Sequence, residues 1–473
     1  MAGTSLDWLR SQTVGIDVEV QLLDGTRRAH VNLDNASSTP TFKPVLDRVN
    51  EFLRFYSNVG RGTGFKSQIA THSYEEARCI VARFLNLDTA NDTVIFTRNT
   101  TESLNRLAAL YPFKPDSIVI TTMMEHHSND LPWRRRARVI HTGINPDGSL
   151  DLNDLESKLR QNRGKVALVT VAGASNVTGW VNPVHTIARM AHAHGARLVV
   201  DAAQTAPHRP IDMRPAADPE HIDFLAFSGH KTYAPFGIGV LAGDRNLLHA
   251  AEPCLVGGGV VDLVTCDTAI WRGLPDREEA GTPNIVGTVG LAAAIKVLES
   301  IGWDAIQQHE DTLTRYALAR LNQIPRIRVY GKTSADDLSD RLGVIAFGLD
   351  GKSCQLGAAV LAYEAGIGAR CGLFCAHPYV LSLLGVVGDE LNRLTARARA
   401  GEPLGVAGLI RASIGAYNSL SDIDALCDCL EALVQDRHAR YEPYMNAGDL
   451  RPAGIQPASL EECFRLNPDL KVH

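Results

Sequence analysis

Short apolar runs alternate with amphipathic stretches between about residues 75 and 245 of this chain. The runs are four to six residues long, the length of buried strands, and most of the stretches between them have helical spacing. Such alternation predicts an α/β fold with a mostly parallel sheet, whose ligands bind beyond the carboxyl ends of the strands. The seven predicted strands are residues 94–97, 118–121, 138–141, 166–171, 197–201, 223–228 and 238–242.

Helices and strands are also predicted outside this alternating pattern. Residues 185–194 form a predicted helix, and Gly195 suits the left-handed position that follows it. An amphipathic helix from Ile285 to about Ile301 is predicted to lead out of the sheet domain. After about residue 305 the pattern becomes α+β, with helical stretches again within 379–409. The elements predicted there are a helix through 313–321 and strands at 327–330 and 343–347.

These patterns divide the chain into two domains with a segment at each end. At 473 residues the chain is too long for one small core, so a larger and a smaller domain are expected. The predicted parts are residues 1–30, packing with the small domain, a large domain of 31–300, a small domain of 301–440 and a C-terminal extension of 441–473.

Composition excludes several classes of protein. The net charge is −6 and there is no basic block, so neither a nucleic acid nor an anionic membrane is expected as a partner. The sequence shows no signal-peptide core and no apolar stretch long enough to span a bilayer. Its nine cysteines are scattered and include no Cys-x-x-Cys, which indicates a reducing compartment and predicts a cytoplasmic location.

Two polar residues follow neighbouring predicted strands and together indicate a cofactor. Asp201 closes the apolar run 197–201, and Lys231 lies 30 residues later, just after Ser228 closes the run 223–228. Pyridoxal phosphate (PLP) needs an amine that condenses with its aldehyde and a carboxylate that keeps its pyridine nitrogen protonated. Either residue alone would be an ordinary ion-pair or surface residue; together at strand ends, they predict a PLP site.

The chain resembles fold-type I PLP enzymes of the class V aminotransferase group, and most closely the SUF-type cysteine desulfurases and selenocysteine lyases. The likeness covers roughly residues 30–430 and rests on short motifs that occur in the family's order. These motifs are Asn32-Leu33-Asp34-Asn35-Ala36, Asn99-Thr100-Thr101-Glu102-Ser103, Glu125-His126-His127-Ser128-Asn129, Ser175-Asn176-Val177-Thr178-Gly179, Asp201-Ala202-Ala203-Gln204, Ser228-Gly229-His230-Lys231, Ala280-Gly281-Thr282-Pro283-Asn284 and Arg411-Ala412-Ser413.

The resemblance implies a phosphate site and a shared active site. Thr100 and Thr101 open a predicted helix, whose free N–H groups and positive dipole end suit a phosphate. The alternative for this motif is an ordinary threonine cap of the helix. Ser228 and His230 are implied as further phosphate donors. Thr282 resembles the residue that the family contributes across the dimer interface, which implies a homodimer with shared active sites.

Three further side chains are implied to hold the cofactor ring. The resemblance makes His126 the imidazole that stacks on the pyridine ring, and Asn176 and Gln204 the amides that bond the phenolic oxygen. Asn176 also suits a simple turn before Thr178. A metal pair formed by His126 and His127 is not expected, because adjacent residues on an extended segment face opposite ways, and no other metal site is predicted.

Two arginines and one cysteine are candidates for acting on an amino-acid substrate. Arg411, and after it Arg370, can hold a carboxylate through two hydrogen bonds. The alternative for Arg370 is a structural role beside the cysteine segment. Asn176 is a further candidate for contact with the substrate. Cys375 lies in an Arg-x-Gly-x-x-Cys-Ala pattern that begins at Arg370 and resembles the cysteine loop of the SUF-type desulfurases. There the cysteine attacks the sulfur of the bound substrate and becomes a persulfide, from which an acceptor protein takes the sulfur.

The sequence departs from the family at three places. Gly60 and Gly64 stand where the family has histidines, and Leu373 and Phe374 replace two histidines before the loop cysteine. Apolar neighbours disfavour a thiolate, although Arg370 and the freedom of Gly372 favour a reactive loop. Cys375 and Arg411 are 36 positions apart, which indicates an insertion at about 380–405.

Three functions therefore compete. The first is a cysteine desulfurase, which converts L-cysteine to L-alanine and transfers sulfur to Cys375. The second is another PLP reaction on this scaffold, namely a C–S lyase, a selenocysteine lyase or an epimerase of the isopenicillin N type. The third is a non-catalytic binding module, which an intact Lys231, Asp201 and Arg411 argue against.

Overall fold

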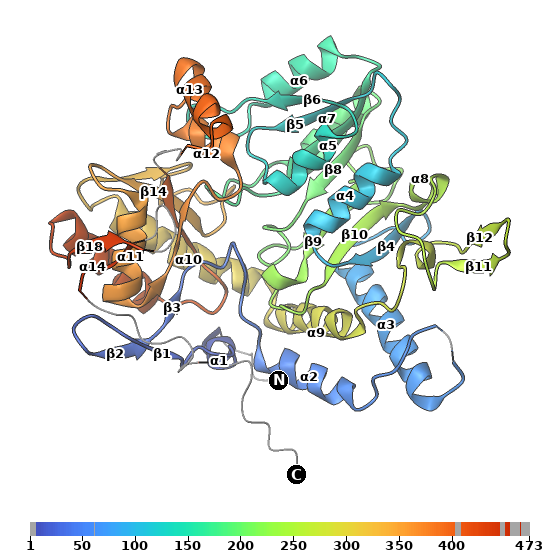
Figure 1. Cartoon of the computed structure of the whole chain (residues 1–473), viewed down its shortest axis with the longest axis horizontal. Coiled ribbons are helices and arrows are strands. Elements are labelled where there is room, and N and C mark those ends of the chain that lie inside the picture. Colours follow the sequence, from blue (N-terminus) through green and yellow to red (C-terminus); the bar gives the residue numbers. More distant parts are fainter. Residues whose placement is uncertain (1–5, 61, 403–407, 445–449, 455–463, 465–473) are drawn as a thin grey trace.

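The computed structural model describes residues 6–60, 62–402, 408–444, 450–454 and 464, and it folds into two lobes (Figure 1). The large lobe contains a seven-stranded sheet in the order β4-β10-β9-β8-β7-β5-β6, in which β10 alone runs against its neighbours. Its strands are β4 (Asp92–Thr97), β5 (Ile118–Thr122), β6 (Arg138–Thr142), β7 (Val166–Ala172), β8 (Arg197–Asp201), β9 (Phe224–Ser228) and β10 (Gly239–Asp244).

The strands of this sheet are apolar because the sheet is buried on both faces. Along β8, Leu198 and Val200 pack on one face and Val199 packs on the other. The first face is covered by α3 (Phe65–Phe84), α6 (Leu152–Gln161), α7 (Val184–Ala193) and α9 (Ile285–Ile301). The second is covered by α4 (Thr100–Leu110), α5 (Leu131–Arg134) and α8 (Arg245–Ala250).

The small lobe is built on a four-stranded antiparallel sheet with its own apolar core. Its strands are, in spatial order, β13 (Ile327–Tyr330), β14 (Val344–Leu349), β17 (Leu409–Ser413) and β16 (Arg370–Gly372). The helices α10 (Trp303–Leu321), α11 (Cys354–Ala365) and α14 (Leu420–Val434) pack on it. A short parallel pair, β3 (Val31–Asn32) with β15 (Ile367–Gly368), joins the segment that precedes the large lobe to the small lobe.

The N-terminal segment contacts the small lobe. Arg10, on α1 (Leu6–Ser11), forms an ion pair with Asp422 of α14 at 2.9 Å. The hairpin of β1 (Glu19–Gln21) and β2 (Arg27–Ala29) follows, and Leu23 N–H donates to Tyr363 O of α11. The chain then forms α2 (Lys43–Leu53), which packs against α9 of the large lobe.

The strand predictions are confirmed for all seven strands, each within two residues at either end. The helix ending before Gly195 is also confirmed, with Gly195 at φ +75°. The helix predicted through 313–321 begins earlier, at Trp303, because Gly302, at φ +93°, ends one helix and precedes the next.

No single helix of the described residues is long and apolar enough to span a membrane. The bent pair α9–α10 passes this test only when its two helices are taken together, by length and hydropathy.

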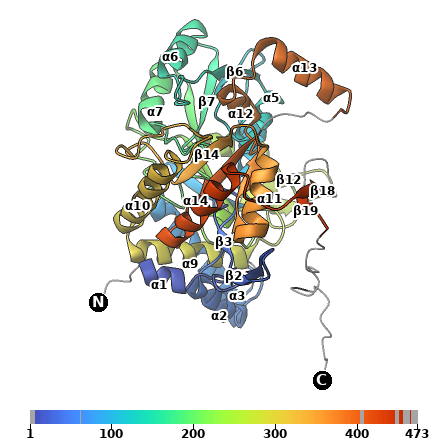
Figure 2. The same ribbon diagram turned by 90° about the vertical axis from the view of Figure 1, so that its left-hand side faces the viewer.

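The predicted insertion is mostly helical where the structure describes it. It contains most of α12 (His377–Leu383) and all of α13 (Gly388–Arg399), which has no buried residue and stands clear of both lobes in two views (Figures 1 and 2). Residues 403–405 of the insertion lie outside the described residues, as does most of the C-terminal extension. The described part of the C-terminal extension includes β18 (Tyr441–Pro443) and β19 (Leu450–Pro452), which pair antiparallel.

Candidate active site

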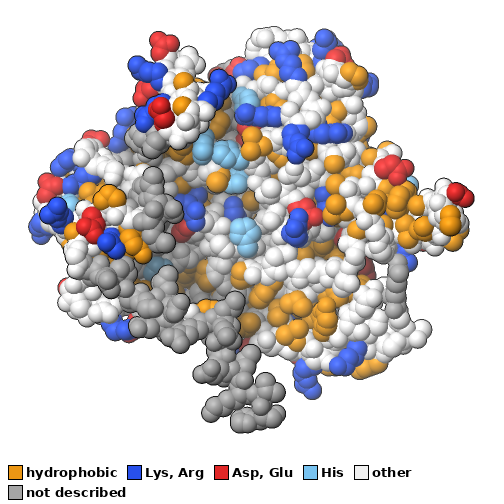
Figure 3. Space-filling view, viewed as in Figure 1, with side chains coloured by type: hydrophobic (Ala, Val, Ile, Leu, Met, Phe, Trp, Pro, Cys, Tyr) orange, Lys and Arg blue, Asp and Glu red, His pale blue; other side chains and the backbone are white. Residues whose placement is uncertain are grey.

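A cavity of about 310 Å³ lies beyond the carboxyl ends of the parallel strands, where the small lobe meets the sheet. Figure 3 shows histidine and basic side chains gathered in the hollow between the lobes. Every predicted site residue except Thr282 lines the cavity. These residues are Thr100, Thr101, His126, Asn176, Asp201, Gln204, Ser228, His230, Lys231, Arg370, Cys375 and Arg411.

Hydroxyl groups and a helix N-terminus form one end of the cavity. Asn99 caps α4, since its side chain accepts from Glu102 N–H at 2.9 Å, so the alternative of a threonine cap is wrong. Thr100 N–H donates to Ser228 Oγ at 2.8 Å, and the Thr101 and Ser128 hydroxyls lie 2.7 Å apart. This concentration of donors around a positive dipole end suits an anion.

His230 adds a neutral imidazole to the same end of the cavity. Its burial, together with the positive charge of Lys231, lowers the pKa of His230 to about 4. The ring is therefore uncharged at neutral pH and offers one N–H donor.

A carboxylate and an amine also line the cavity. Asp201 Oδ1 accepts from Ala203 N–H at 3.0 Å, the one donor to this carboxylate found in the described residues. Burial raises the pKa of Asp201, while the Ala203 N–H and Lys231 favour the charged form. Burial lowers the pKa of Lys231 to about 8, with Asp201 opposing the shift. A larger fraction of this amine than of an ordinary lysine is thus in the uncharged, nucleophilic state at neutral pH.

His126 presents a neutral imidazole with a defined tautomer. Ser128 N–H donates to His126 Nδ1 at 3.2 Å, which leaves the ring proton on Nε2. Burial lowers the pKa of His126 to about 3, and the positive charge of Lys231 adds to this shift. The ring is therefore an uncharged surface at the cavity wall, as stacking on a pyridine ring requires.

The two predicted amides both line the cavity and both have protein partners. Gln204 Nε2 donates to Ala36 O at 2.7 Å, and Asn176 Nδ2 donates to Phe374 O at 2.9 Å. In each amide one of the two N–H donors is thereby occupied, so the second N–H and the side-chain oxygen remain for a ligand. Asn176 also ties the loop that carries Cys375 to the large lobe.

The two candidate arginines are neighbours on paired strands and share one carboxylate. Arg370 and Arg411 face each other in the register of β16 and β17. Arg411 Nη2 donates to Asp34 Oδ1 at 2.7 Å, and Arg370 Nε donates to Asp34 Oδ2 at 3.0 Å. Arg411 is 2 % exposed whereas Arg370 is exposed. One negative charge between two positive charges leaves this end of the cavity net positive.

Cys375 lies on a short loop between β16 and α12. The loop backbone is left-handed at two non-glycine residues, Phe374 at φ +51° and Cys375 at φ +52°, which is sterically costly. Cys375 O accepts from His127 N–H at 2.7 Å, and the Phe374 ring lies 5.1 Å from the Arg411 guanidinium carbon. These contacts hold the strained loop, on which Cys375 is exposed and also lines the cavity.

Sequence reasoning missed three residues that shape this site. Asn99, Ser128 and Asp34 each lie inside a motif shared with the family, but the predicted site does not include them. The spacing of Asn99 and Glu102 is a recognisable cap signal, since a short polar side chain three residues before Glu marks a helix start. Nothing in the local sequence indicates that Asp34 pairs with arginines more than 300 residues away.

Thr282 does not line the cavity of this chain. It is exposed in the loop before α9. Its predicted role requires a second copy of the chain, so that role stays a prediction.

Comparison with known proteins gives one consistent answer. The family described as Aminotransferase class-V matches residues 31–426. The "Probable cysteine desulfurase" of Halalkalibacterium halodurans is 37% identical over 85% of this chain and 92% of its own length. The "Cysteine desulfurase" of Haloferax volcanii is 36% identical over 85% of this chain and 89% of its own length.

Two solved structures are also similar. The apo cysteine desulfurase of Thermococcus onnurineus has a TM-score of 0.75 and 35% identity, covering 86% of this chain and 95% of its own. The S-sulfonic acid form of the Escherichia coli cysteine desulfurase CsdA has a TM-score of 0.74 and 30% identity, covering 91% of this chain and 98% of its own.

Proposed function

The chain belongs to the aminotransferase class-V family, and we propose that it is a PLP-dependent cysteine desulfurase, which converts L-cysteine to L-alanine and transfers the sulfur to Cys375. One observation carries this proposal: Lys231, Arg411 and Cys375 line the same cavity. An amine, a carboxylate binder and a thiol are the groups that a desulfurase needs side by side.

The residues of the cavity fit PLP. Thr100, Thr101, Ser228 and His230 would hold the phosphate, Asp201 would face the ring nitrogen, and Lys231 would meet the aldehyde. The single donor to the buried Asp201 carboxylate supports this, because a buried carboxylate otherwise lacks compensation for lost hydration. When bound, PLP supplies an aldehyde that condenses with amines and a protonated ring that accepts electrons.

Two residues manage charge and protons around the substrate. The Lys231 amine, with its pKa lowered to about 8, can both take and return a proton near neutral pH. His126 stays neutral, because burial holds its pKa at about 3, and it closes one side of the cavity without adding charge.

Arg411 orients the substrate by its carboxylate. Its guanidinium is fixed by Asp34, by Ser37 Oγ at 2.5 Å and by Asn176 O at 2.9 Å, so little side-chain freedom is left to lose on binding. The net positive charge of the two arginines and Asp34 attracts an α-carboxylate. The rest of the amino acid would then lie in the cavity that Lys231 and Cys375 also line.

Cys375 accepts the sulfur. As the carbon–sulfur bond of the substrate breaks, its electron pair stays on carbon, which is then protonated to give alanine. The substrate sulfur forms a new sulfur–sulfur bond with Cys375 and becomes its persulfide. Because Cys375 is exposed, the persulfide can then be reached by a thiol reductant or by a sulfur-acceptor protein.

Product analysis tests the proposed function. The PLP-loaded protein, given L-cysteine and a thiol reductant, is expected to release alanine and sulfide in equal amounts. A C–S lyase would instead release pyruvate and ammonia, and an epimerase would return D-cysteine. Either set of products in place of alanine would exclude a desulfurase.

We expect Arg411→Lys to lower kcat/KM for L-cysteine by roughly 30- to 1,000-fold, because lysine keeps the charge but loses the two-point contact. This corresponds to about 2–4 kcal/mol of transition-state binding. The measurement compares L-cysteine with cysteamine, which lacks the carboxylate. The variant should lose activity toward L-cysteine and little activity toward cysteamine.

Arg370→Lys is the matched control, since Arg370 occupies the facing register position but is exposed. It should retain most of the preference for L-cysteine. If Arg370→Lys loses that preference and Arg411→Lys keeps it, Arg370 is the carboxylate binder.

A second copy of the chain completes this proposal. Five large apolar side chains near Thr282 are exposed on β11 (Val261–Val264), β12 (Ala269–Trp271) and the loop before them, where Figure 3 shows apolar side chains gathered. They are Leu255, Val256, Leu263, Val264 and Ile270. Covering such a patch in a homodimer is favourable, and the predicted role of Thr282 requires such a second copy. Sedimentation at the mass of a single chain would contradict this.

A further inference from the structure

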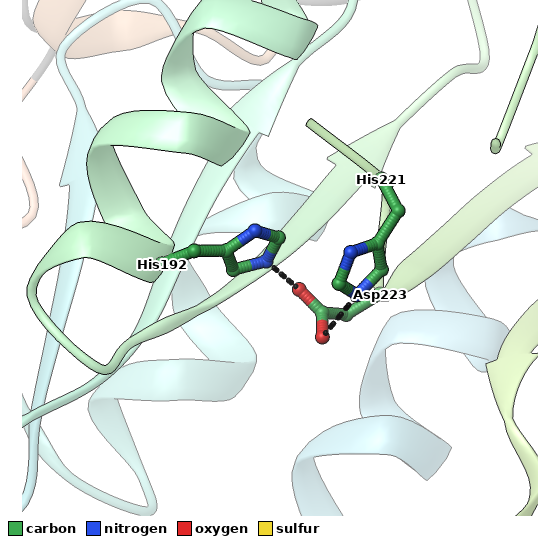
Figure 4. A group of neighbouring side chains, drawn as sticks. All are labelled: His192, His221 and Asp223. Atoms are coloured by element: carbon green, nitrogen blue, oxygen red, sulfur yellow. Dashed lines mark hydrogen bonds and ion pairs between the residues drawn. The ribbon is translucent and has the colours of Figure 1, made fainter. Parts of the chain in front are cut away.

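A second cluster of titratable side chains lies at the amino ends of the sheet strands, opposite the active site at their carboxyl ends. His192 of α7, His221 and Asp223 point toward one another at the amino ends of β8 and β9 (Figure 4). The cluster borders a separate cavity of about 400 Å³. Asp201 closes the other end of β8, so the active site is about 13 Å away along that strand.

The hydrogen bonds of the two imidazoles fix their tautomers. His192 Nδ1 lies 2.7 Å from Pro219 O, and His221 Nδ1 lies 2.6 Å from Asp218 O. A carbonyl oxygen only accepts, so both Nδ1 atoms are donors. Each neutral ring therefore turns the lone pair of its Nε2 toward Asp223. Metal-binding histidines are oriented by the same kind of outer hydrogen bond.

This arrangement requires a positive charge between the rings and the carboxylate. His192 Nε2 lies 2.8 Å from Asp223 Oδ2, and His221 Nε2 lies 3.2 Å from Asp223 Oδ1. Two lone pairs facing a carboxylate at these distances repel it. Either a second proton on each ring or a shared cation removes the repulsion.

Two extra protons suit this site less well than one metal ion. The rings stack with centroids 4.4 Å apart, so two imidazolium cations would repel each other. Arg197 already donates to Asp223 Oδ1 at 2.8 Å. A divalent ion with neutral imidazoles would instead place the positive charge on one ion beside Asp223 and leave no charge on either stacked ring.

We propose that His192, His221 and Asp223 form a zinc-binding site that clamps α7 to the start of β9. The three ligand atoms lie within 4.8 Å of one another, and atoms bound to one zinc ion lie about 3 to 3.5 Å apart, so small side-chain shifts close the site. Two imidazoles and one carboxylate match zinc, whereas magnesium and calcium prefer all-oxygen sites. The neighbouring cavity leaves the fourth position to water.

The proposed zinc site is open to solvent, and its role is to stabilise the fold. The imidazoles are each 18% exposed while Asp223 is 2% exposed, so an ion can enter against a fixed carboxylate. The carboxylate also accepts from Leu198 N–H of β8 at 2.7 Å. Zinc there would join α7 to the loop before β9 and to Asp223, which also accepts from β8.

Zinc binding to matched variants of the full-length, PLP-loaded protein tests the site. His192→Gln and His221→Gln each keep a side-chain amide near Asp223 but remove an imidazole ligand. His194→Gln is the control, because His194 lies two residues after His192 but contacts Glu156 and not Asp223. Equilibrium dialysis against zinc, after removal of metals with a chelator, counts the bound ions. The cofactor absorbance and circular dichroism of each variant check its folding.

The wild type and His194→Gln should bind one more zinc ion than either site variant, or bind it at least about tenfold more tightly. Zinc, and not magnesium, should raise the unfolding temperature of the wild type by about 2–5 °C, and this rise should shrink in both site variants. Equal zinc binding by all four proteins would overturn the proposal. The cluster would then be an ion-pair network of imidazolium and carboxylate. Because zinc can also bind Cys375, only the difference between variants counts.

Discussion

Replacement of Lys231 by alanine should lower cysteine turnover by at least about a thousandfold, because it removes both the attachment point of the cofactor and the group that moves protons. Visible absorbance of the purified protein provides the first readout. The wild type should be yellow, and reduction with borohydride should fix PLP to the peptide that contains Lys231. The Lys231→Ala protein should hold PLP only non-covalently.

Lys231→Arg is the matched control, because arginine keeps the positive charge but has no nucleophilic amine at neutral pH. It should be as inactive as Lys231→Ala. If Lys231→Arg retains turnover, the lysine acts only through its charge. A wild-type protein that gains no visible absorbance when PLP is added would exclude the cofactor altogether.

The lowered pKa of the Lys231 amine predicts that cofactor loading depends on pH. Burial lowers the pKa of Lys231 to about 8, so the uncharged amine becomes the major form above that pH. The rate at which PLP attaches to the cofactor-free protein should therefore rise through about pH 8, well below the range of an ordinary lysine. Stopped-flow absorbance measures this rate.

Replacement of Cys375 by serine should reduce alanine formation from L-cysteine by at least about a hundredfold, since a hydroxyl cannot accept the sulfur at neutral pH. Cofactor binding should be unchanged, because Cys375 lies on the loop between β16 and α12 rather than on the strands that hold Lys231 and Asp201. Alanine and sulfide assays under reductant measure the loss.

Cys371→Ser provides the comparison for this variant, because Cys371 lies four residues earlier on β16 and is half-buried. It should form alanine at close to the wild-type rate. If Cys375→Ser still releases sulfide as fast as the wild type, the sulfur does not pass through Cys375 and a lyase is the better description.

The fold could be predicted from sequence because each strand of the large sheet is buried on both faces and therefore apolar throughout. Leu198, Val199 and Val200 are typical. The site could be predicted in part, because Asp201 and Ser228 end neighbouring parallel strands and so must meet at one edge. The place of Lys231 follows from its position just beyond Ser228.

Contacts between distant segments could not be predicted in the same way. Asp34 bridges Arg370 and Arg411 only because β3 joins the small lobe through β15. The donation from Asn176 to Phe374 O depends on how one lobe meets the other. His192, His221 and Asp223 come from a helix, a loop and the residue before a strand, a spacing that matches no metal motif.

The most direct test of a desulfurase follows the sulfur itself. The PLP-loaded wild type is given a short pulse of L-cysteine without reductant, alkylated, digested and analysed by peptide mass spectrometry. One extra sulfur atom is expected on the peptide at Cys375, together with one alanine released per site. Pyruvate with an unmodified Cys375, or the extra sulfur on Cys371 instead, would contradict transfer of sulfur to Cys375.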